Sequence, residues 1–290
     1  MIASILVMHY TAPAELVETF SLFVSGDLPD EQIDLIRGAL TIARTDYPRL
    51  EIEEYAARID RMAARAASLS AGSDTQSLMA AVNKVVFEQA NLKGNREDYY
   101  DPRNSFLNDV LDRGLGIPIT LSIIYMEVAN RVGLPLSGVG MPGHFLLKHY
   151  AEDGEERLID CFNRGDIVSR QDCQMRLDEI YSGEMKLRPE FLHTISRRQI
   201  LTRMLNNLKT VYLSTRNFRK ALPLADLVLV IYPRSAEDLK QRALLRYSMG
   251  LQTLAGEDLE QYLKMSPNAS DAEEIKQMSL SIRRMMALRN

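Results

Sequence analysis

Two polar residues sixteen positions apart, His144 and Asp160, are of the types that could carry out acid–base chemistry together. An imidazole titrates near neutral pH, and a carboxylate bonded to one ring nitrogen fixes the tautomer and leaves the other nitrogen as a base. His144 lies in "GHFLLKHY" and Asp160 in "ERLIDCF", and both runs have the composition of strands. The chemistry therefore depends on whether both side chains lie on one face of a sheet.

The loop between these strands decides the question. A two-residue turn at Asp153-Gly154 would put the two side chains on opposite faces, because side chains alternate along a strand. A longer loop with 151–153 at its tip pairs His144 directly with Asp160. That register also creates an apolar and an opposite-charge cross-strand pair, which are Leu146 with Leu158 and Lys148 with Glu156. We therefore expect the longer loop, with Asp160 accepting a hydrogen bond from His144.

Covalent catalysis would also require a nucleophile, and two hydroxyls lie near the start of the helix predicted over 118–133. Thr120 points some 200° around the helix axis from position 118, whereas Ser122 returns near the face of 118 about one turn deeper. Hydroxyls inside helices usually bond to their own backbone. Ser122 remains the alternative nucleophile.

The two cysteines are expected to serve in packing. Cys161 follows Asp160 directly, so its side chain should point away from His144 and be a buried, inert thiol. Cys173 lies near the start of a predicted helix, "SRQDCQMRLDEIY". Two cysteines are also too few for a disulfide framework, which indicates the reducing cytoplasm.

The composition argues against several other functions. A net charge of −4 and a pI of about 5.7 disfavour a broad nucleic-acid surface. No apolar run reaches the length of about 18 residues that a membrane span needs. No Cys, His or carboxylate spacing completes a zinc site, and no glycine-rich phosphate loop is present. We expect neither a metal nor another cofactor.

The elements that must position these residues fall into three regions, which predict a mostly helical α+β protein. Residues 1–92 show apolar residues at helical spacing, with Asp30 as the N-cap of the first of three helices. Residues 93–194 contain most of the Gly and Pro turn signals, the predicted helix and the short strands, which indicates a small antiparallel sheet packed on a helix. Residues 195–290 are helical again.

The last region contains a repeat. Pro233 and Pro267 are 34 residues apart, and so are Ala221 and Ala255. This period, with a small residue where two helices cross closely, resembles tetratricopeptide repeats, although two unrelated amphipathic hairpins would also fit. Such repeats imply a protein or peptide partner. The polar residues on the inner helices that could contact it are Asn206, Asn207, Lys209 and Arg242.

The segment "GLGIPITLSIIYMEVANRVGLPLSGVGMPGHFLLKH", followed by "LIDCFNRG", resembles the transglutaminase-like, papain-like superfamily. In that superfamily a Gly-x-Cys opens a buried helix, and a His and an Asp follow on two strands. The resemblance places the Gly at Gly116, the His at His144 and the Asp at Asp160. The position of the cysteine falls on Pro118, which carries no nucleophile and has no backbone N–H to stabilise an oxyanion.

The order of regions resembles a bacterial branch of this superfamily with C-terminal tetratricopeptide repeats, which includes invasion-regulator-type proteins, and a related core occurs in an animal F-box protein. In that branch "G-x-P-I-x-L" commonly replaces the cysteine segment. The absence of a cysteine at position 118 favours a non-catalytic, regulatory protein-interaction protein, or pseudoenzyme, in which the core is a retained scaffold. The alternative is a hydrolase or acyl-transferase that uses His144 and Asp160 with a non-cysteine nucleophile or an activated water.

Overall fold

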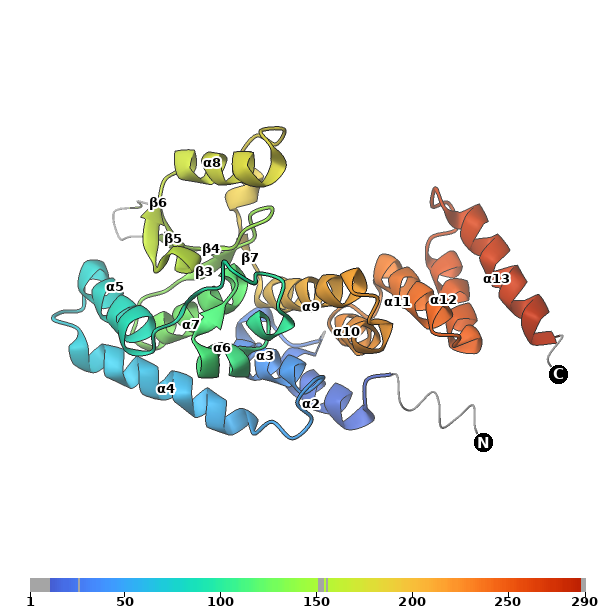
Figure 1. Ribbon diagram of the computed structural model, residues 1–290, viewed down its shortest axis with the longest axis horizontal. Coiled ribbons are helices and arrows are strands. Elements are labelled where there is room, and N and C mark those ends of the chain that lie inside the picture. Colours follow the sequence, from blue (N-terminus) through green and yellow to red (C-terminus); the bar gives the residue numbers. More distant parts are fainter. Residues whose placement is uncertain (1–10, 26, 151–153, 155, 288–290) are drawn as a thin grey trace. The chain divides into compact units, whose positions relative to one another are not determined.

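The computed structural model describes residues 11–25, 27–150, 154 and 156–287, which form a mostly helical α+β protein, as predicted (Figure 1). The chain divides into two compact units. We call Pro29–Ala43 with Tyr47–Met204 the core unit, and Met1–Leu28, Arg44–Asp46 and Leu205–Asn290 the repeat unit. The division into 1–92, 93–194 and 195–290 stays a prediction.

The core unit begins with helices that pack on a central helix, α7 (Pro118–Arg131). These are α3 (Leu35–Ala43), α4 (Ile52–Leu69) and α5 (Thr75–Asn83), which continues into a π-helical turn, η2 (Lys84–Gln89). The buried residues of α4 are spaced by four, three, four and three positions, which turns one apolar stripe toward the core. They are Ile52, Ala56, Ile59, Ala63 and Ala66.

The prediction that Asp30 caps the first helix of the 1–92 region is wrong. Asp30 begins a short 3₁₀ helix, and Asp34 instead accepts the backbone N–H of Arg37 at 2.9 Å at the start of α3. The carboxylate of Asp30 accepts the backbone N–H groups of Arg197 and Arg198 at 2.8 and 3.1 Å. These residues open α9 (Arg197–Ser214), so Asp30 satisfies the N-terminus of a helix far along the chain.

Helix α7 is the centre of the core unit. Every residue from Pro118 to Ala129 is buried, so the helix is covered on all sides. Pro118 occupies the first helical position, where its missing N–H costs nothing. The helix ends at Arg131, two residues before the predicted end, and Gly133 follows with a φ of +86°. Before it lie η3 (Pro102–Asn104), α6 (Leu107–Arg113) and the paired short strands β1 (Lys93–Gly94) and β2 (Leu115–Gly116).

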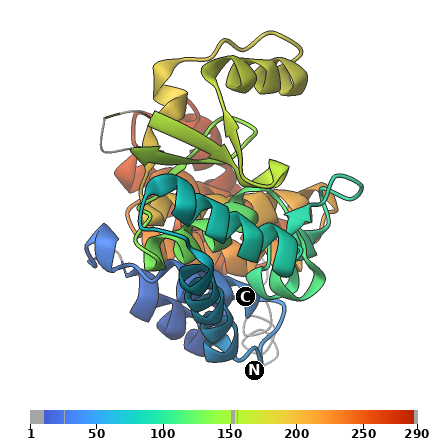
Figure 2. The same ribbon diagram turned by 90° about the vertical axis from the view of Figure 1, so that its left-hand side faces the viewer.

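A five-stranded antiparallel sheet in the order β6-β5-β4-β3-β7 packs on α7. Its strands are β3 (Ser137–Val139), β4 (Leu146–Tyr150), β5 (Glu156–Asp160), β6 (Asp166–Val168) and β7 (Thr194–Ile195). Helix α8 (Arg170–Tyr181) lies over the face opposite to α7 (Figures 1 and 2). The 3₁₀ turns η4 (Cys161–Asn163) and η5 (Pro189–Leu192) connect these elements. The sequence predicted a sheet on a helix but missed β6 and β7.

The predicted register of β4 and β5 is wrong by two residues. Lys148 faces Leu158 and Leu147 faces Ile159, whereas the prediction paired Leu146 with Leu158 and His144 with Asp160. A shift of two keeps every side chain on its predicted face because strand side chains alternate with period two. The ion pair of Lys148 with Glu156 still forms diagonally at 3.2 Å. The predicted loop tip, 151–153, lies outside the described residues.

The described residues of the repeat unit form α2 (Ala14–Val24), the C-terminal part of α9 and four further helices. They are α10 (Phe218–Ile231), α11 (Ala236–Ser248), α12 (Gln252–Met265) and α13 (Ala272–Ala287), and each packs on the next (Figure 1). Ala221 and Ala255, the repeated small residues, are both fully buried. Two helical hairpins with small residues at the crossing are the arrangement that the 34-residue period predicts.

We expect Gly165→Ala to destabilise the protein more than Gly183→Ala does. Both glycines have φ near +80°, so both substitutions add about 1 kcal/mol of backbone strain. A Cβ at Gly165 would lie 2.5 Å from Asn83 Oδ1 and 2.9 Å from the Phe87 ring, whereas one at Gly183 meets nothing within 4 Å. Overpacking should therefore cost Gly165→Ala about 1–3 kcal/mol more. Urea unfolding measures the difference, and equal losses would contradict the expected contact.

Candidate functional site

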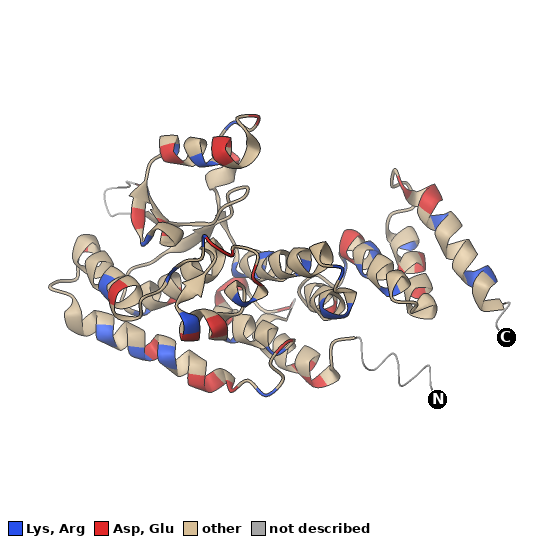
Figure 3. Ribbon diagram, in the orientation of Figure 1, with Lys and Arg blue, Asp and Glu red and all other residues tan. Residues whose placement is uncertain are grey.

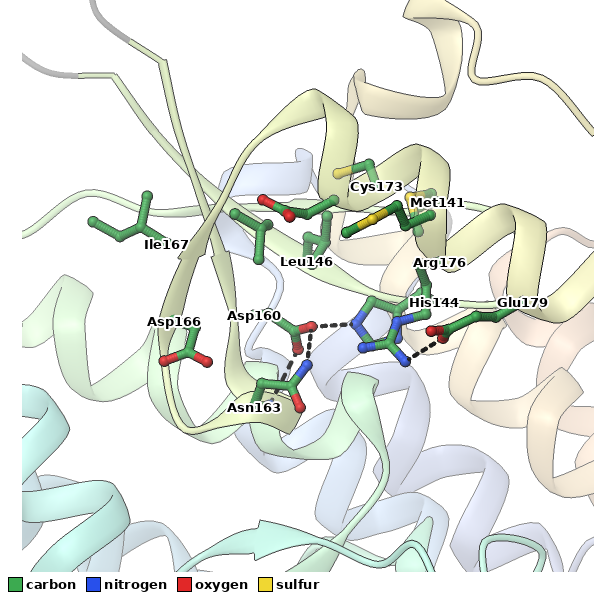
Figure 4. Close-up of a pocket in the computed structure, with 13 residues that line it drawn as sticks. Met141, His144, Leu146, Asp160, Asn163, Asp166, Ile167, Cys173, Arg176 and Glu179 are labelled. Carbon is green, nitrogen blue, oxygen red and sulfur yellow. Dashed lines mark hydrogen bonds and ion pairs between the residues drawn. The ribbon is translucent and has the colours of Figure 1, made fainter.

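The carboxylate of Asp160, at the end of β5, accepts four hydrogen bonds. Oδ1 accepts the backbone N–H groups of Phe162 and Asn163 at 3.0 and 3.3 Å. Oδ2 accepts a hydrogen bond from Nε2 of His144 at 2.9 Å and another from Nδ2 of Asn163 at 2.8 Å (Figure 4). The structure therefore brings His144 and Asp160 together on the predicted face of the sheet, and adds Asn163, which sequence reasoning did not identify.

These hydrogen bonds set the charge of the pair. Burial alone would raise the pKa of Asp160, but the hydrogen bonds from His144 and Asn163 outweigh it and hold this pKa below its usual value. Asp160 is therefore ionised at neutral pH and can only accept. His144 must carry its proton on Nε2, so Nδ1 of the neutral ring has a free lone pair. A group so arranged can accept a hydrogen bond or act as a base.

A partly buried arginine positions His144. The guanidinium of Arg203, on α9, donates to the carbonyl oxygens of Met141 and His144 at 2.7 and 2.6 Å, and lies 5.7 Å from the centre of the Phe145 ring. The backbone N–H of His144 also donates to the carbonyl of Met141 at 3.1 Å, which closes a turn through Gly143. Arg203 thus ties the loop before β4 to a helix, although no local sequence pattern marks it.

The imidazole and the carboxylate face a pocket of about 390 Å³ between the sheet and α8 (Figure 4). His144 is 6% exposed and Asp160 is 2% exposed. Apart from the amide of Asn163, the other lining residues are apolar or charged, and they come mainly from β6 and α8. They are Met141, Leu146, Asn163, Asp166, Ile167, Val168, Asp172, Cys173, Met175, Arg176 and Glu179.

The hydroxyls of α7 lie away from this pocket. Thr120 Oγ1 donates to the carbonyl of Asn104 at 2.8 Å and accepts the backbone N–H of Ile117 at 3.1 Å, so it closes the start of the helix. Ser122 is fully buried beside the Cys161 thiol and does not line the pocket. Ser122 is therefore a core residue rather than a residue of the pocket.

Both thiols are free and buried. Cys161 lies wholly in the core, as predicted, and burial raises its pKa far above the usual range. Cys173 lines the pocket but is 2% exposed, and burial raises its pKa to about 11. Both side chains are therefore protonated thiols at neutral pH, which are weak nucleophiles.

The residues that the structure describes contain no group of three or more His, Cys, Asp or Glu side chains that could hold a metal ion. Of the helices formed by these residues, none combines the length and the apolar character needed to cross a membrane. Figure 3 shows both basic and acidic residues in each unit, whereas α9 carries Lys and Arg without Asp or Glu.

Two of the four predicted partner contacts already bond inside the repeat unit. Lys209 is buried, and its Nζ donates to Gln241 Oε1 at 2.8 Å. Arg242 forms ion pairs with Asp226 at 3.1 Å and with Asp258 at 2.7 Å. The other two, Asn206 and Asn207 on α9, are partly exposed.

Arg242 belongs to a buried charge network. Arg246, one turn along α11, pairs with Asp258 at 2.7 Å and with Asp226 at 3.6 Å, and Asp226 also accepts the backbone N–H of Ala12 at 2.9 Å. We call Asp226, Arg242, Arg246 and Asp258 the charge network. It joins α10, α11 and α12, and its side chains are at most 18% exposed.

We expect Asp160→Asn to lower the free energy of unfolding at neutral pH by about 1–3 kcal/mol, because an amide nitrogen cannot accept both bonds made by Oδ2. The folded pKa of Asp160 lies below the unfolded value of about 3.9. Its stabilisation is therefore complete above that value and is lost as the pH falls through the folded pKa.

Urea unfolding of the wild-type and Asp160→Asn chains from pH 7 to pH 2.5 measures this effect. The difference in unfolding free energy between the two chains should become smaller as the pH falls to 2.5. A gap that is independent of pH would show that the ionised form of Asp160 is not what stabilises the fold.

Two family models match the chain. A model described as the transglutaminase-like superfamily matches residues 53–206, which include α4, α7, the His144 and Asp160 pair, and α8. A model of the tetratricopeptide repeat matches residues 208–279, which run from α9 to α13. The predicted likeness to a transglutaminase-like core and to these repeats is thereby confirmed, while the narrower likeness to invasion-regulator-type proteins stays a prediction.

Several relatives are similar to this chain. A UPF0162 protein of Xylella fastidiosa is 36% identical over 251 residues, 85% of this chain and 89% of that protein, and one of Vibrio cholerae is 28% identical over 254 residues, 86% and 94% of the two. F-box only protein 21 of Mus musculus is 30% identical over 185 residues, which cover 59% of this chain and 28% of that protein. Because the transglutaminase-like model matches more than half of this chain, the chain belongs to the transglutaminase-like superfamily.

Proposed function

We propose that this is a non-catalytic, regulatory protein-interaction protein, in which the core unit supplies a binding pocket and the repeats bind a protein or peptide. The proposal is supported by the burial and protonation of the side chains that could serve as nucleophiles. The thiol nearest the pocket, Cys173, is protonated and buried, Ser122 lies in the core, and Pro118 stands where the resemblance places a cysteine. His144 and Asp160 then serve as a rigid hydrogen-bonding pair.

The repeats are the proposed surface for the partner, because helical repeats of this type generally mediate protein–protein interaction. Lys209 and Arg242 hold helices together from inside, so we place the contacts chiefly at Asn206 and Asn207. The free thiols of Cys161 and Cys173 suit a reducing compartment, and we propose the cytoplasm.

A second candidate function is a hydrolase or acyl-transferase, which the geometry of His144 favours. His144 lines the pocket, and a proton on Nε2 leaves a lone pair on Nδ1, so the ring could take a proton from a bound water while Asp160 stabilises the resulting imidazolium. The first function requires that this nitrogen only accepts hydrogen bonds.

Turnover distinguishes the two functions. We expect the full chain and its His144→Ala and Ser122→Ala variants to give the same background rates with amide, ester and glutamine acyl-transfer substrates. Thermal unfolding checks that each variant folds. If His144→Ala removes a rate that the folded wild type has, the enzyme function replaces the first proposal.

Partner binding has its own test. We expect the Asn206→Ala, Asn207→Ala double variant to capture fewer proteins from a bacterial lysate than the wild type, as quantified by mass spectrometry. Gln261→Ala, an exposed change on the outer helix α12, is the matched control and should capture the wild-type set. Equal capture by all three chains would exclude this part of α9 as the binding surface.

A further inference from the structure

We propose that a basic groove on the core unit binds an acidic segment of a partner protein. The groove lies between α4, the π-helical turn η2 and the end of α6, and its volume is about 370 Å³. None of its residues lines the pocket of His144 or belongs to the repeat unit, so this inference goes beyond the proposed function. The residues of this arginine groove are Arg58, Arg61, Met62, Arg65, Val85, Gln89, Ala90 and Leu111.

The three arginines form one stripe along α4. They occupy positions i, i+3 and i+7, which fall on the same face of an α-helix. Arg61 and Arg65 are exposed, and Arg58 is partly exposed. Like charges at this spacing destabilise a helix by a few tenths of a kcal/mol, roughly as much as opposite charges stabilise it. A bound anion would relieve the repulsion.

Only one of these arginines has a counterion within the described part of the chain. Arg58 forms an ion pair with Asp112. Arg65 donates to Gln89 Oε1 at 3.3 Å, which is a neutral acceptor. In the same described ranges the guanidinium of Arg61 has neither a hydrogen bond nor an ion pair. Because the described residues that line the groove include no Asp or Glu, the groove offers unpaired positive charge to a ligand.

The acidic residues on the other side of α4 are already paired. Glu53 forms an ion pair with Arg37 at 2.5 Å, and Asp60 forms one with Arg131 at 2.8 Å. Helical spacing turns Glu53 and Asp60, seven positions apart, to a different side of the helix from the arginines. Glu54 lies on the arginine side but outside the groove lining. Figure 3 shows both signs of charge on α4. The acidic residues of this helix are therefore no counterions for the groove.

The π-helical turn supplies one wall and a further donor. The backbone N–H of Ala90 donates to the carbonyl of Val85 at 2.9 Å, a bond across five residues. Single π-helical turns are frequent at functional sites. Gln89 of this turn is exposed, and its Oε1 accepts from Arg65, so its amide N–H groups are additional donors for a carboxylate.

The apolar part of the groove distinguishes between kinds of anion. Met62 and Ala90 are partly exposed, and Val85 and Leu111 line the groove beside them. A guanidinium binds a carboxylate through two parallel hydrogen bonds, while an apolar side chain next to the carboxylate can contact this surface. Inorganic phosphate would leave the apolar residues uncovered. A net charge of −4 disfavours a nucleic-acid backbone. We therefore assign the groove to glutamate or aspartate beside an apolar residue.

Calorimetric titration of the full chain with the blocked peptide acetyl-Gly-Glu-Leu-Glu-Gly-amide tests the proposal. Matched peptides carry glutamine in place of both glutamates, or serine in place of leucine. We expect saturable binding of the first peptide, binding about tenfold weaker for the glutamine peptide because the ion pairs are lost, and about fivefold weaker for the serine peptide because the apolar contact is lost.

Variants locate the binding in the groove. The double variant Arg61→Gln, Arg65→Gln should weaken the acidic peptide about tenfold. The double variant Lys186→Gln, Arg234→Gln removes the same charge at exposed positions outside the groove, and is the matched control. Its Kd should stay unchanged at a salt concentration of about 0.15 M, where distant surface charges are screened. Thermal unfolding checks that both variants fold.

Four results would overturn the inference: equal binding of the glutamate and glutamine peptides, an unchanged Kd in the folded Arg61→Gln, Arg65→Gln chain, an equal loss in the control variant, or no saturable binding. Titration with a short oligouridylate covers the other anion. If the oligonucleotide binds more tightly than the acidic peptide and loses affinity in the same double variant, the groove is a nucleic-acid site and the assignment to an acidic protein segment is wrong.

Discussion

The ionised carboxylate of Asp160 is the constraint on which the site depends. Its two oxygens end strand β5, begin the turn η4, fix the imidazole of His144 and hold Asn163. Removing a charge from water is costly, and here four donors compensate for it. Because one group performs all these tasks, the position of the strand end and the tautomer of the histidine cannot vary independently.

The two faces of the sheet pack against different helices. On one face, α7 is buried on every side and supplies the packing that keeps the strands in place. On the other, α8 covers an apolar cluster that includes Leu146, Leu158 and Leu177, and the pocket that His144 lines lies beside it. The sheet, held in place by α7, forms one side of the pocket, and α8 covers the other side in part.

Much of this arrangement follows from local pattern. The helix from Pro118, the facing of His144 and Asp160, the burial of Cys161 and the repeat in the last region were all predictable, because alternation and helical spacing determine them. The wrong assignments share a different cause. Asp30 caps a helix far along the chain, and the register of β4 depends on tertiary packing rather than on pair preferences.

Other features of the site carried no sequence signal. Strands β6 and β7 are three and two residues long, too short for alternation to be visible. Arg203 acts on backbone carbonyls, which every residue has, so its targets leave no trace in residue type. Hydrogen bonds from a side chain to backbone carbonyls can be recognised only in the folded structure.

The charge network in the repeat unit has a consequence for how such an array can change. Repeat proteins lengthen or shorten by whole units when each neighbour interface is interchangeable. Here the arginines of α11 are matched to an aspartate on the helix before and one on the helix after. Adding or deleting one unit at this place would leave a buried charge without its counterion. The number of repeats is therefore fixed by electrostatics in the middle of the array, and growth would be tolerated only at its end.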